Sequence, residues 1–370
     1  MWNRFQFITI RQPGVKGESL TMELGCCLMD PVPPPSRSRD RAPTIRDVAR
    51  HAKVGVGTVS RVLNDSPLVS EDARRRVHRT IDELGYRRSS TARNLSLGRT
   101  QMIGVVAPFF TSASVLERLR GVVDKLRDHG DYDLVLFDVE TLAQREGAFR
   151  SFARTDRVDG LLIMSLRPTD EEVESLQREE LPVVLVDVVH PALPRVVIDD
   201  VLGGTMATEH LLARGHTRIG FVGDEPTPFG FTSSERRRQG MARALRRAGI
   251  RRNGALECRA PHGREQARES AERLLNLPEP PTAIFAASDV QAMGVLEAAR
   301  AKGRRVPEDL GVIGFDDIEV AEVLGLTTIR QPLRKTGARG VELLLSAIDG
   351  NRTVPTEELA PLTVVARRTT

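Results

Sequence analysis

Several polar side chains fall at the ends of apolar runs, where they could bind a polar small molecule. Asp187 ends "PVVLVD", Asp316 ends "GVIGFD", and Ser288 and Asp289 follow "TAIFAA". Carboxylates accept hydrogen bonds from hydroxyl groups, and the guanidinium of Arg237, in "ERRRQG", presents a planar fork of donors. An Asp after a strand also commonly caps the next helix, and we favour that role for Asp289. The other residues point to a ligand cleft.

A second candidate for chemistry is "VGVGTVSRVLN", residues 54–64. Glycines here precede Thr58, Ser60 and Arg61 on an apolar frame. The frame falls on one side of a short helix and consists of Val54, Val59, Val62 and Leu63. The polar residues are therefore left on the other side.

The strand-end residues must be positioned by a parallel α/β arrangement. From residue 101, short apolar runs such as "MIGVVA", "DLVLFDV", "DGLLIM" and "RIGFVGD" alternate with helical patterns at 114–128, 203–214, 233–248 and 289–301. This length favours two βαβ lobes over one. Ligands of open parallel sheets bind outside the carboxyl ends of the strands, so we expect the cleft there.

Three short helices are predicted ahead of this region. The first, in "TIRDVARHA", begins at Thr44 with Asp47 three residues later, as in a capping box. The second is the stretch 54–64, and the third begins after Ser70 and stops at Gly85. Three such helices, with a tight turn between the first two, are typical of a helix-turn-helix, whose second helix enters the DNA major groove.

Charge supports DNA binding more strongly than the helix count, since many three-helix units are structural. Residues 44–98 contain 11 Arg and Lys against 6 Asp and Glu, a net charge of +5 in a chain whose total is +4. The basic excess therefore lies in this unit, as expected for a domain that neutralises phosphates.

Composition and missing motifs exclude other classes of protein. No run approaches the ~18 apolar residues of a membrane span, and no export signal begins the chain, so we expect a cytoplasmic protein without membrane contact. The three cysteines have neither disulfide-framework nor zinc-site spacing. The motifs G-x-x-x-x-G-K-[ST], G-x-S-x-G and H-E-x-x-H are absent. We therefore expect no catalysis, no cofactor and no metal.

Eight motifs in matching order resemble those of bacterial transcription regulators of the lactose-repressor/galactose-repressor (LacI/GalR) family. They are "TIRDVARHAKVGVGTVSRVLND", "VSEDARRRVHRTIDELGY", "ARNLSLGRT", "HLLARGHTRIGFVG", "ERRRQGMARAL", "SDVQAMGVLEAAR", "GVIGFDD" and "LTTIRQP". The resemblance spans residues 44 to about 368. It implies an all-α helix-turn-helix headpiece followed by an α/β two-lobed core, like periplasmic binding proteins, with parallel sheets.

We therefore expect four segments. The proline-rich end of residues 1–43 indicates a disordered extension, or an over-extended gene start. The other three segments are expected to be the DNA-binding domain at 44–86, a hinge helix or linker at 87–100, and the effector-binding and dimerisation core at 101–368. Within the core, we expect one lobe at about 101–199 plus 332–360 and the other at about 200–331.

The resemblance implies base reading by the second helix. Val56, Gly57 and Arg61 fall where family members contact bases, and an arginine can donate a fork to guanine O6 and N7. Gly55 replaces the family's usual serine at the start of this helix, which costs only a few tenths of a kcal/mol. Because Val56 and Gly57 offer almost no hydrogen bonding, reading must depend on Arg61, on contact with a thymine methyl and on DNA shape.

Other DNA contacts are expected to set register without reading sequence. Thr58, Ser60 and Asn64 match positions that touch phosphate or frame the helix, and Thr44 belongs to the same expected DNA-binding set. For Ser60 and Asn64, capping or local backbone bonding is the alternative.

The linker resembles the family's hinge helix at Thr91, Ala92, Arg93, Asn94 and Leu95. That helix forms when two subunits meet over the minor groove. Leu95 falls where an apolar wedge enters a base step and kinks the duplex, with packing against the core as the alternative. The family's proline near the start of the hinge is replaced by Arg88, which implies a less rigid start.

In the core, the resemblance places four residues around a small-molecule effector: Asp187, Arg237, Ser288 and Asp316. The expected effector is a sugar, a sugar derivative or another polar metabolite. Asn is common in the family where Ser288 stands. Phe109 and Phe110 follow the first strand and are expected to stack on a sugar face or a planar base, or else to pack between the lobes.

The sequence thus predicts a DNA-binding transcription regulator, expected to be a repressor, whose affinity for double-stranded operator DNA is controlled by a small-molecule effector. The regulator is expected to be a homodimer, or a tetramer. The alternative is a two-lobed sugar-binding protein without DNA function, and the basic helical unit argues against it.

Overall fold

The structure, a computed structural model, describes residues 43–63, 65–86, 99–110, 112–129, 132–152, 157–226, 229, 231–351 and 357–370. The chain divides into two compact units, Met1–Arg88 and Ser89–Thr370, and each is described by itself. Among the described helices, none is both long enough and apolar enough to cross a membrane.

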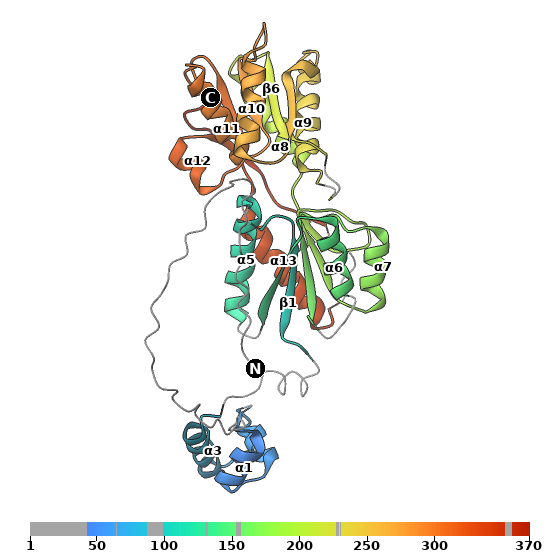
Figure 1. Cartoon of the computed structure of the whole chain (residues 1–370), viewed down its shortest axis with the longest axis vertical. Helices are drawn as coiled ribbons and strands as arrows, with labels where there is room; N and C mark the ends of the chain where they lie inside the picture. Colours follow the sequence, from blue (N-terminus) through green and yellow to red (C-terminus); the bar gives the residue numbers. More distant parts are fainter. Residues whose placement is uncertain are drawn as a thin grey trace, which may run out of the picture. The chain divides into compact units, whose positions relative to one another are not determined.

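The amino-terminal unit contains the three predicted helices, which are α1 (Ile45–Ala52), α2 (Val56–Leu63) and α3 (Glu71–Leu84) (Figure 1). Ser70 begins α3 as predicted, because its hydroxyl accepts from the amide of Ala73 at 3.4 Å. Gly85 ends α3 in the left-handed region, at φ 59°, where glycine carries no Cβ penalty. Val48, Val59, Val62 and Val77 form the centre of a small core.

The first lobe of the carboxyl-terminal unit is a six-stranded sheet in the order β11-β5-β4-β3-β1-β2. Its strands pair in parallel, and are β1 (Met102–Ala107), β2 (Asp133–Asp138), β3 (Gly160–Met164), β4 (Val183–Val186), β5 (Arg195–Val197) and β11 (Glu357–Leu359). Ile103 and Val105 pack under α5 (Ala113–His129) and α13 (Leu333–Ile348). Val106 packs on the opposite face, under α6 (Leu142–Phe152) and α7 (Asp170–Arg178).

The second lobe is a six-stranded sheet in the order β12-β10-β9-β8-β6-β7. Its elements are α8 (Asp200–Ala213), β6 (Ile219–Asp224), α9 (Ser233–Arg247), η1 (Gly254–Leu256), β7 (Glu257–Ala260), α10 (Arg264–Leu275), β8 (Ala283–Ala286), α11 (Asp289–Ala301), β9 (Gly311–Asp316), α12 (Glu319–Leu324), β10 (Thr327–Arg330) and β12 (Thr363–Val365). β12 lies antiparallel to β10, unlike the predicted parallel arrangement. The reason is that β10 runs toward the first lobe, where α13 follows it, whereas β12 enters this sheet from β11 of the first lobe.

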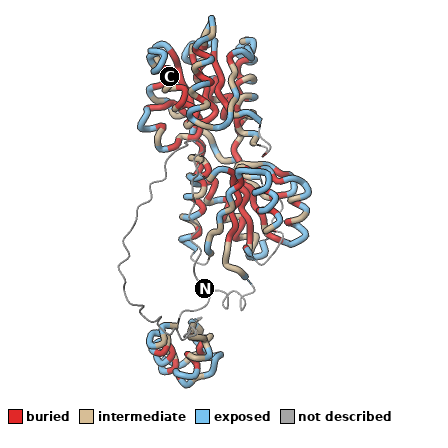
Figure 2. Tube along the Cα trace, viewed as in Figure 1, coloured by how far each residue is buried: buried red, intermediate tan, exposed pale blue. Residues whose placement is uncertain are grey.

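The chain passes between the lobes three times, at residues 198–199, 331–332 and 360–362. Each passage leaves the carboxyl end of one strand and enters the other lobe. The predicted strand-end residues therefore lie near the junction of the lobes. Figure 2 shows that the buried positions are concentrated along the strands of both sheets.

Candidate functional site

α2 presents the predicted base-reading residues on its exposed side. Val56 is 43% exposed, and Gly57 and Arg61 are also exposed, whereas Val59 and Val62 are buried. Gly57 and Arg61 are four residues apart and so share a helix face. A Cβ atom at position 57 would lie 3.8 Å from Nη2 of Arg61. The guanidinium therefore lies beside the glycine, where position 57 contributes no side chain to confine it.

Thr44 begins α1 in the predicted way. Its N–H and its hydroxyl donate to the carboxylate of Asp47 at 2.9 and 2.7 Å. Thr58 and Ser60 are half-buried, and the Thr58 amide donates to the carbonyl of Gly55 at 2.9 Å. These residues thus frame the two helices, and their phosphate contacts stay predictions. The other predicted DNA-contact residues lie outside the described residues: Asn64, Thr91, Ala92, Arg93 and Leu95.

Among the described residues of the amino-terminal unit, most basic side chains face solvent. The exposed set is Arg46, Arg50, Lys53, Arg61, Arg75, Arg76 and Arg79. Arg74 instead ties α3 to the preceding loop, since Nη2 donates to the carbonyl of Ser66 at 2.8 Å and Nη1 to the carboxylate of Asp65 at 3.2 Å. The exposed positive charge suits a polyanionic phosphate backbone.

The carboxyl-terminal unit surrounds the buried Arg237 with acceptors at the strand ends. Nε donates to Oδ1 of Asp200 at 2.8 Å, and Nη1 donates to the carbonyl of Ala287 at 2.6 Å. Nη1 also lies 3.7 Å from Oδ1 of Asp316. The guanidinium carbon is 3.6 Å from the ring centre of Phe315, a cation–π contact. Arg237 and Asp316 are therefore brought together as the sequence predicted.

Asp187 joins this cluster through a chain of polar contacts. It accepts from the hydroxyl of Ser165 at 2.8 Å and pairs with Nη2 of Arg118 at 2.9 Å. The same nitrogen of Arg118 donates to Oε1 of Gln331 at 2.9 Å, and Nε2 of Gln331 donates to Asp316 at 2.5 Å. Because Asp187 belongs to the first lobe and Asp316 to the second, this series of polar contacts links the two lobes.

The cluster contains more acid than base. Three carboxylates, those of Asp187, Asp200 and Asp316, meet the guanidiniums of Arg118 and Arg237. Burial raises the pKa of Asp200 to about 6 and also raises the pKa of Asp316, while the positive charge of Arg237 opposes both shifts. A ligand that brings hydrogen-bond donors, such as a polyol, suits this environment better than an anion.

Ser288 takes the capping position that was predicted for Asp289, and the effector contact of Ser288 stays a prediction. The hydroxyl of Ser288 caps α11 and accepts from the amide of Gln291 at 3.2 Å. The capping role predicted for Asp289 is wrong. Its carboxylate accepts from the amide of Ile318 at 3.0 Å and from the hydroxyl of Thr328 at 2.6 Å. These partners are far away in sequence, so the local pattern could not reveal them.

Phe109 contacts the connection between β6 and α9. Its ring centre lies 6.3 Å from those of Phe229 and Phe231, which matches the alternative of packing between the lobes. Phe109 nevertheless stays 40% exposed. Phe110 is partly buried against the core under α5. Of the two rings, Phe109 is the one with surface to offer a ligand.

Three members of the cluster were not predicted from the sequence: Arg118, Asp200 and Gln331. Arg118 is 1% exposed and lies on the buried side of α5 with Val115 and Val122. A charged residue on an apolar helix face was therefore the available signal. Asp200 and Gln331 begin a helix and a connection, and no local pattern marks either as part of a site.

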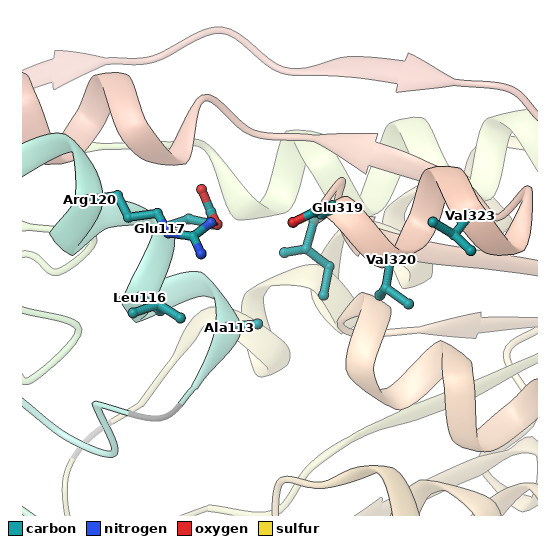
Figure 3. A pocket seen from close by; sticks show the side chains of 8 residues that line it. Ala113, Leu116, Glu117, Arg120, Glu319, Val320 and Val323 are labelled. Atoms are coloured by element: carbon teal, nitrogen blue, oxygen red, sulfur yellow. The ribbon is translucent and has the colours of Figure 1, made fainter.

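A groove lies across both lobes between α5 and α12, with a volume of about 380 Å³. Figure 3 shows side chains of α5 on one side and of α12 on the other. The lining includes Leu116, Glu117 and Arg120 from the first lobe, and Glu319, Val320 and Val323 from the second. Val323 is 75% exposed. The groove is separate from the strand-end cluster.

Comparisons with known proteins match both units. The family described as "Bacterial regulatory proteins, lacI family" matches residues 44–89, and "Periplasmic binding protein-like domain" matches residues 208–370. The HTH-type transcriptional repressor CytR of Escherichia coli K12 is 34% identical over 341 residues, covering 90% of this chain and 98% of the relative.

Two solved structures are similar over 89% of this chain. One is a lac repressor dimer bound to operator and the anti-inducer ONPF, 26% identical, covered to 99% of its own chain, with a TM-score of 0.79. The other is a complex of the transcriptional regulator CelR with cellobiose, 31% identical, covered to 100%, with a TM-score of 0.67. The predicted fold class, a helix-turn-helix headpiece with a two-lobed α/β core, is confirmed.

The raised pKa of Asp200 predicts a pH-dependent stability. Because an unfolded Asp titrates near pH ~3.9, the folded state holds the extra proton up to about pH 6. This group's contribution to stability therefore falls as pH rises through that window and stays low above it. Asp200→Asn removes this titration. Relative to wild type, its free energy of unfolding should therefore rise by up to roughly 3 kcal/mol between pH 4 and pH 7.

Thermal unfolding of both proteins across this pH range measures the difference. Asp128→Asn, an exposed acid on α5, is the control and should melt in parallel with wild type. If the difference in unfolding free energy between Asp200→Asn and wild type stays constant from pH 4 to 7, the raised pKa of Asp200 is contradicted.

Proposed function

Since this chain belongs to the LacI family of bacterial regulatory proteins, we propose that it represses transcription by binding a specific operator under the control of a small-molecule effector. The chain is a transcription regulator with a DNA-binding helix-turn-helix unit and a ligand-binding core. The observation that carries the proposal is the exposed Arg61 on α2 of a basic three-helix unit. Because its target is bacterial DNA, the cytoplasm is its proposed place of action.

We propose that α2 enters the major groove and that Arg61 reads guanine through a bidentate contact. Val56 contacts a thymine methyl, and Gly57 allows close approach. Thr44, Thr58, Ser60 and the exposed arginines set register on the phosphates. In the segment outside the described residues, Asn64, Thr91, Ala92, Arg93 and Leu95 complete the proposed DNA-contact set.

Arg61→Ala should weaken operator binding by roughly 5- to 150-fold, because a bidentate base contact is worth about 1–3 kcal/mol of discrimination. Binding to random duplex should change far less. Fluorescence anisotropy with a duplex from the chain's own promoter region and with a scrambled duplex measures both. Arg305→Ala, an exposed arginine of the second lobe, is the control. Equal losses on both duplexes would exclude Arg61 as a base reader.

We propose that the effector binds at the strand-end cluster and is a sugar or a sugar derivative. The acid-rich set of Asp187, Arg237 and Asp316 favours a ligand with several hydroxyl groups. The solved CelR complex with cellobiose supports this class. Among these three side chains, Asp187 is the most exposed, so a ligand reaches it most readily. Phe109 supplies an apolar face at the same junction. The buried hydroxyl of Ser288 acts indirectly, because it caps the first turn of α11.

A thermal-shift screen of cellobiose, other sugars, sugar acids, nucleosides and purines should find a stabilising compound among the polyols. A ligand at 100 times its Kd stabilises the native state by about 2.7 kcal/mol. Asp187→Asn should remove most of the shift, and Asp128→Asn should keep it. A compound that stabilises both variants equally would exclude Asp187 from the site.

We propose that the groove between α5 and α12 receives a second copy of this chain. The exposed apolar residues of these helices are Leu116, Val123, Val323 and Leu324. The dimeric state of the similar lac repressor structure supports a homodimer, and paired subunits match the two half-sites of a palindromic operator.

Val323→Asp should convert the dimer to monomer, because it places an unpaired charge in an apolar interface. Sedimentation velocity at micromolar concentration measures the mass. The control is Leu142→Asp. Leu142 is an exposed leucine on α6, which packs on the opposite face of the sheet from α5, so this variant should remain dimeric. A Val323→Asp dimer as stable as wild type would place the interface elsewhere.

A further inference from the structure

Gln331 holds both lobes at the amino-terminal end of α13. Its amide oxygen accepts from Arg118 of the first lobe at 2.9 Å, and its amide nitrogen donates to Asp316 of the second at 2.5 Å. Gln331 is buried and only Pro332 separates it from α13. Any change in the distance between Arg118 and Asp316 must therefore move this end of the helix or break one of the bonds.

Arg99 is held at the other end of α13. It is the first described residue after the segment that leads from the DNA-binding unit. Its Nη1 donates to Asp349 at 3.2 Å and to the Tyr132 hydroxyl at 3.5 Å, and its Nη2 donates to the carbonyl of Ile348 at 3.1 Å. The place where the chain enters the core is thus tied to the last turn of α13.

Between these ends, α13 is seated without spare room. A Cβ at Gly337 would lie 2.0 Å from the carbonyl oxygen of Arg118, and one at Gly121 would lie 1.9 Å from that of Arg334. The backbones of α5 and α13 therefore touch directly. A Cβ at Gly340 would lie 2.4 Å from Val186 of β4, the strand that ends at Asp187. A close-packed helix of this kind moves as a unit, because interiors transmit strain instead of absorbing it.

We propose that α13 couples the effector cleft to the DNA-binding segment, with Gln331 and Arg99 as the positioning residues at its two ends. The inference rests on the proposed function. A ligand that donates hydrogen bonds to the carboxylate of Asp187 or Asp316 competes with Arg118 and Gln331 for these acceptors. The resulting shift of α13 moves Ile348 and Asp349, and Arg99 follows them.

A double-mutant cycle tests the coupling without knowledge of the effector. The two ends are about 24 Å apart along a 16-residue helix, and independent effects at such a distance simply combine. Operator affinity of the full chain is measured by fluorescence anisotropy for wild type, Gln331→Glu, Arg99→Gln and the double variant. We expect each single variant to change the affinity several-fold, and the double variant to depart from the product of the two changes by threefold or more.

A departure below threefold would overturn the proposal. Gln331→Asn, which keeps the amide but shortens the side chain, replaces Gln331→Glu if the latter unfolds. The matched control is Arg305→Gln, which breaks an exposed pair with Asp309 and should combine with Gln331→Glu multiplicatively. Failure of the proposed DNA reading appears differently, as equal effects of Arg61→Ala on operator and scrambled duplex in the same assay.

Discussion

The buried guanidinium of Arg237 is the constraint on which the core of this protein depends. A fully desolvated positive charge is tolerated only where acceptors surround it, and here they come from the start of α8, the end of β8 and the end of β9. Meeting that requirement brings Asp200, Ala287 and Asp316 together at the carboxyl ends of the strands. The polar cluster around Arg237 is therefore a condition of folding, whether or not a ligand contacts it.

The acids around Arg237 also link the lobes, since the contact chain from Asp187 to Asp316 passes through Arg118 and Gln331. No member of this chain can rebond without leaving a buried partner unsatisfied, and an unsatisfied buried group costs about 1–3 kcal/mol or more. A ligand that displaces these contacts must therefore supply a donor for each carboxylate and an acceptor for each donor that it displaces. Under the proposed function, this requirement favours small molecules whose donors and acceptors match the displaced contacts.

Much of the fold was predictable because its periodic patterns are strong. The apolar runs at residues 102–107, 219–224 and 311–316 became strands, and the helix after Ser70 ended at Gly85 as predicted. The rule that ligands bind at strand ends pointed to Asp187 and Asp316, whereas the place of Arg237 beside them was implied by the family resemblance. Arg118 was not predicted to join the cluster, because its partner Asp187 lies 69 residues away in the sequence. The role predicted for Asp289 was wrong, because its partner Thr328 lies 39 residues away. Short-range pattern contains no information about such tertiary contacts.

The glycine at position 57 has a consequence for how binding preference can evolve. A side chain there would begin at ordinary van der Waals distance, 3.8 Å, from the end of Arg61. A side chain at position 57 would therefore restrict where the guanidinium can lie, without disturbing the buried valines beneath. Under the proposed reading of guanine by Arg61, substitution at this one position would be a short evolutionary route to a different operator preference.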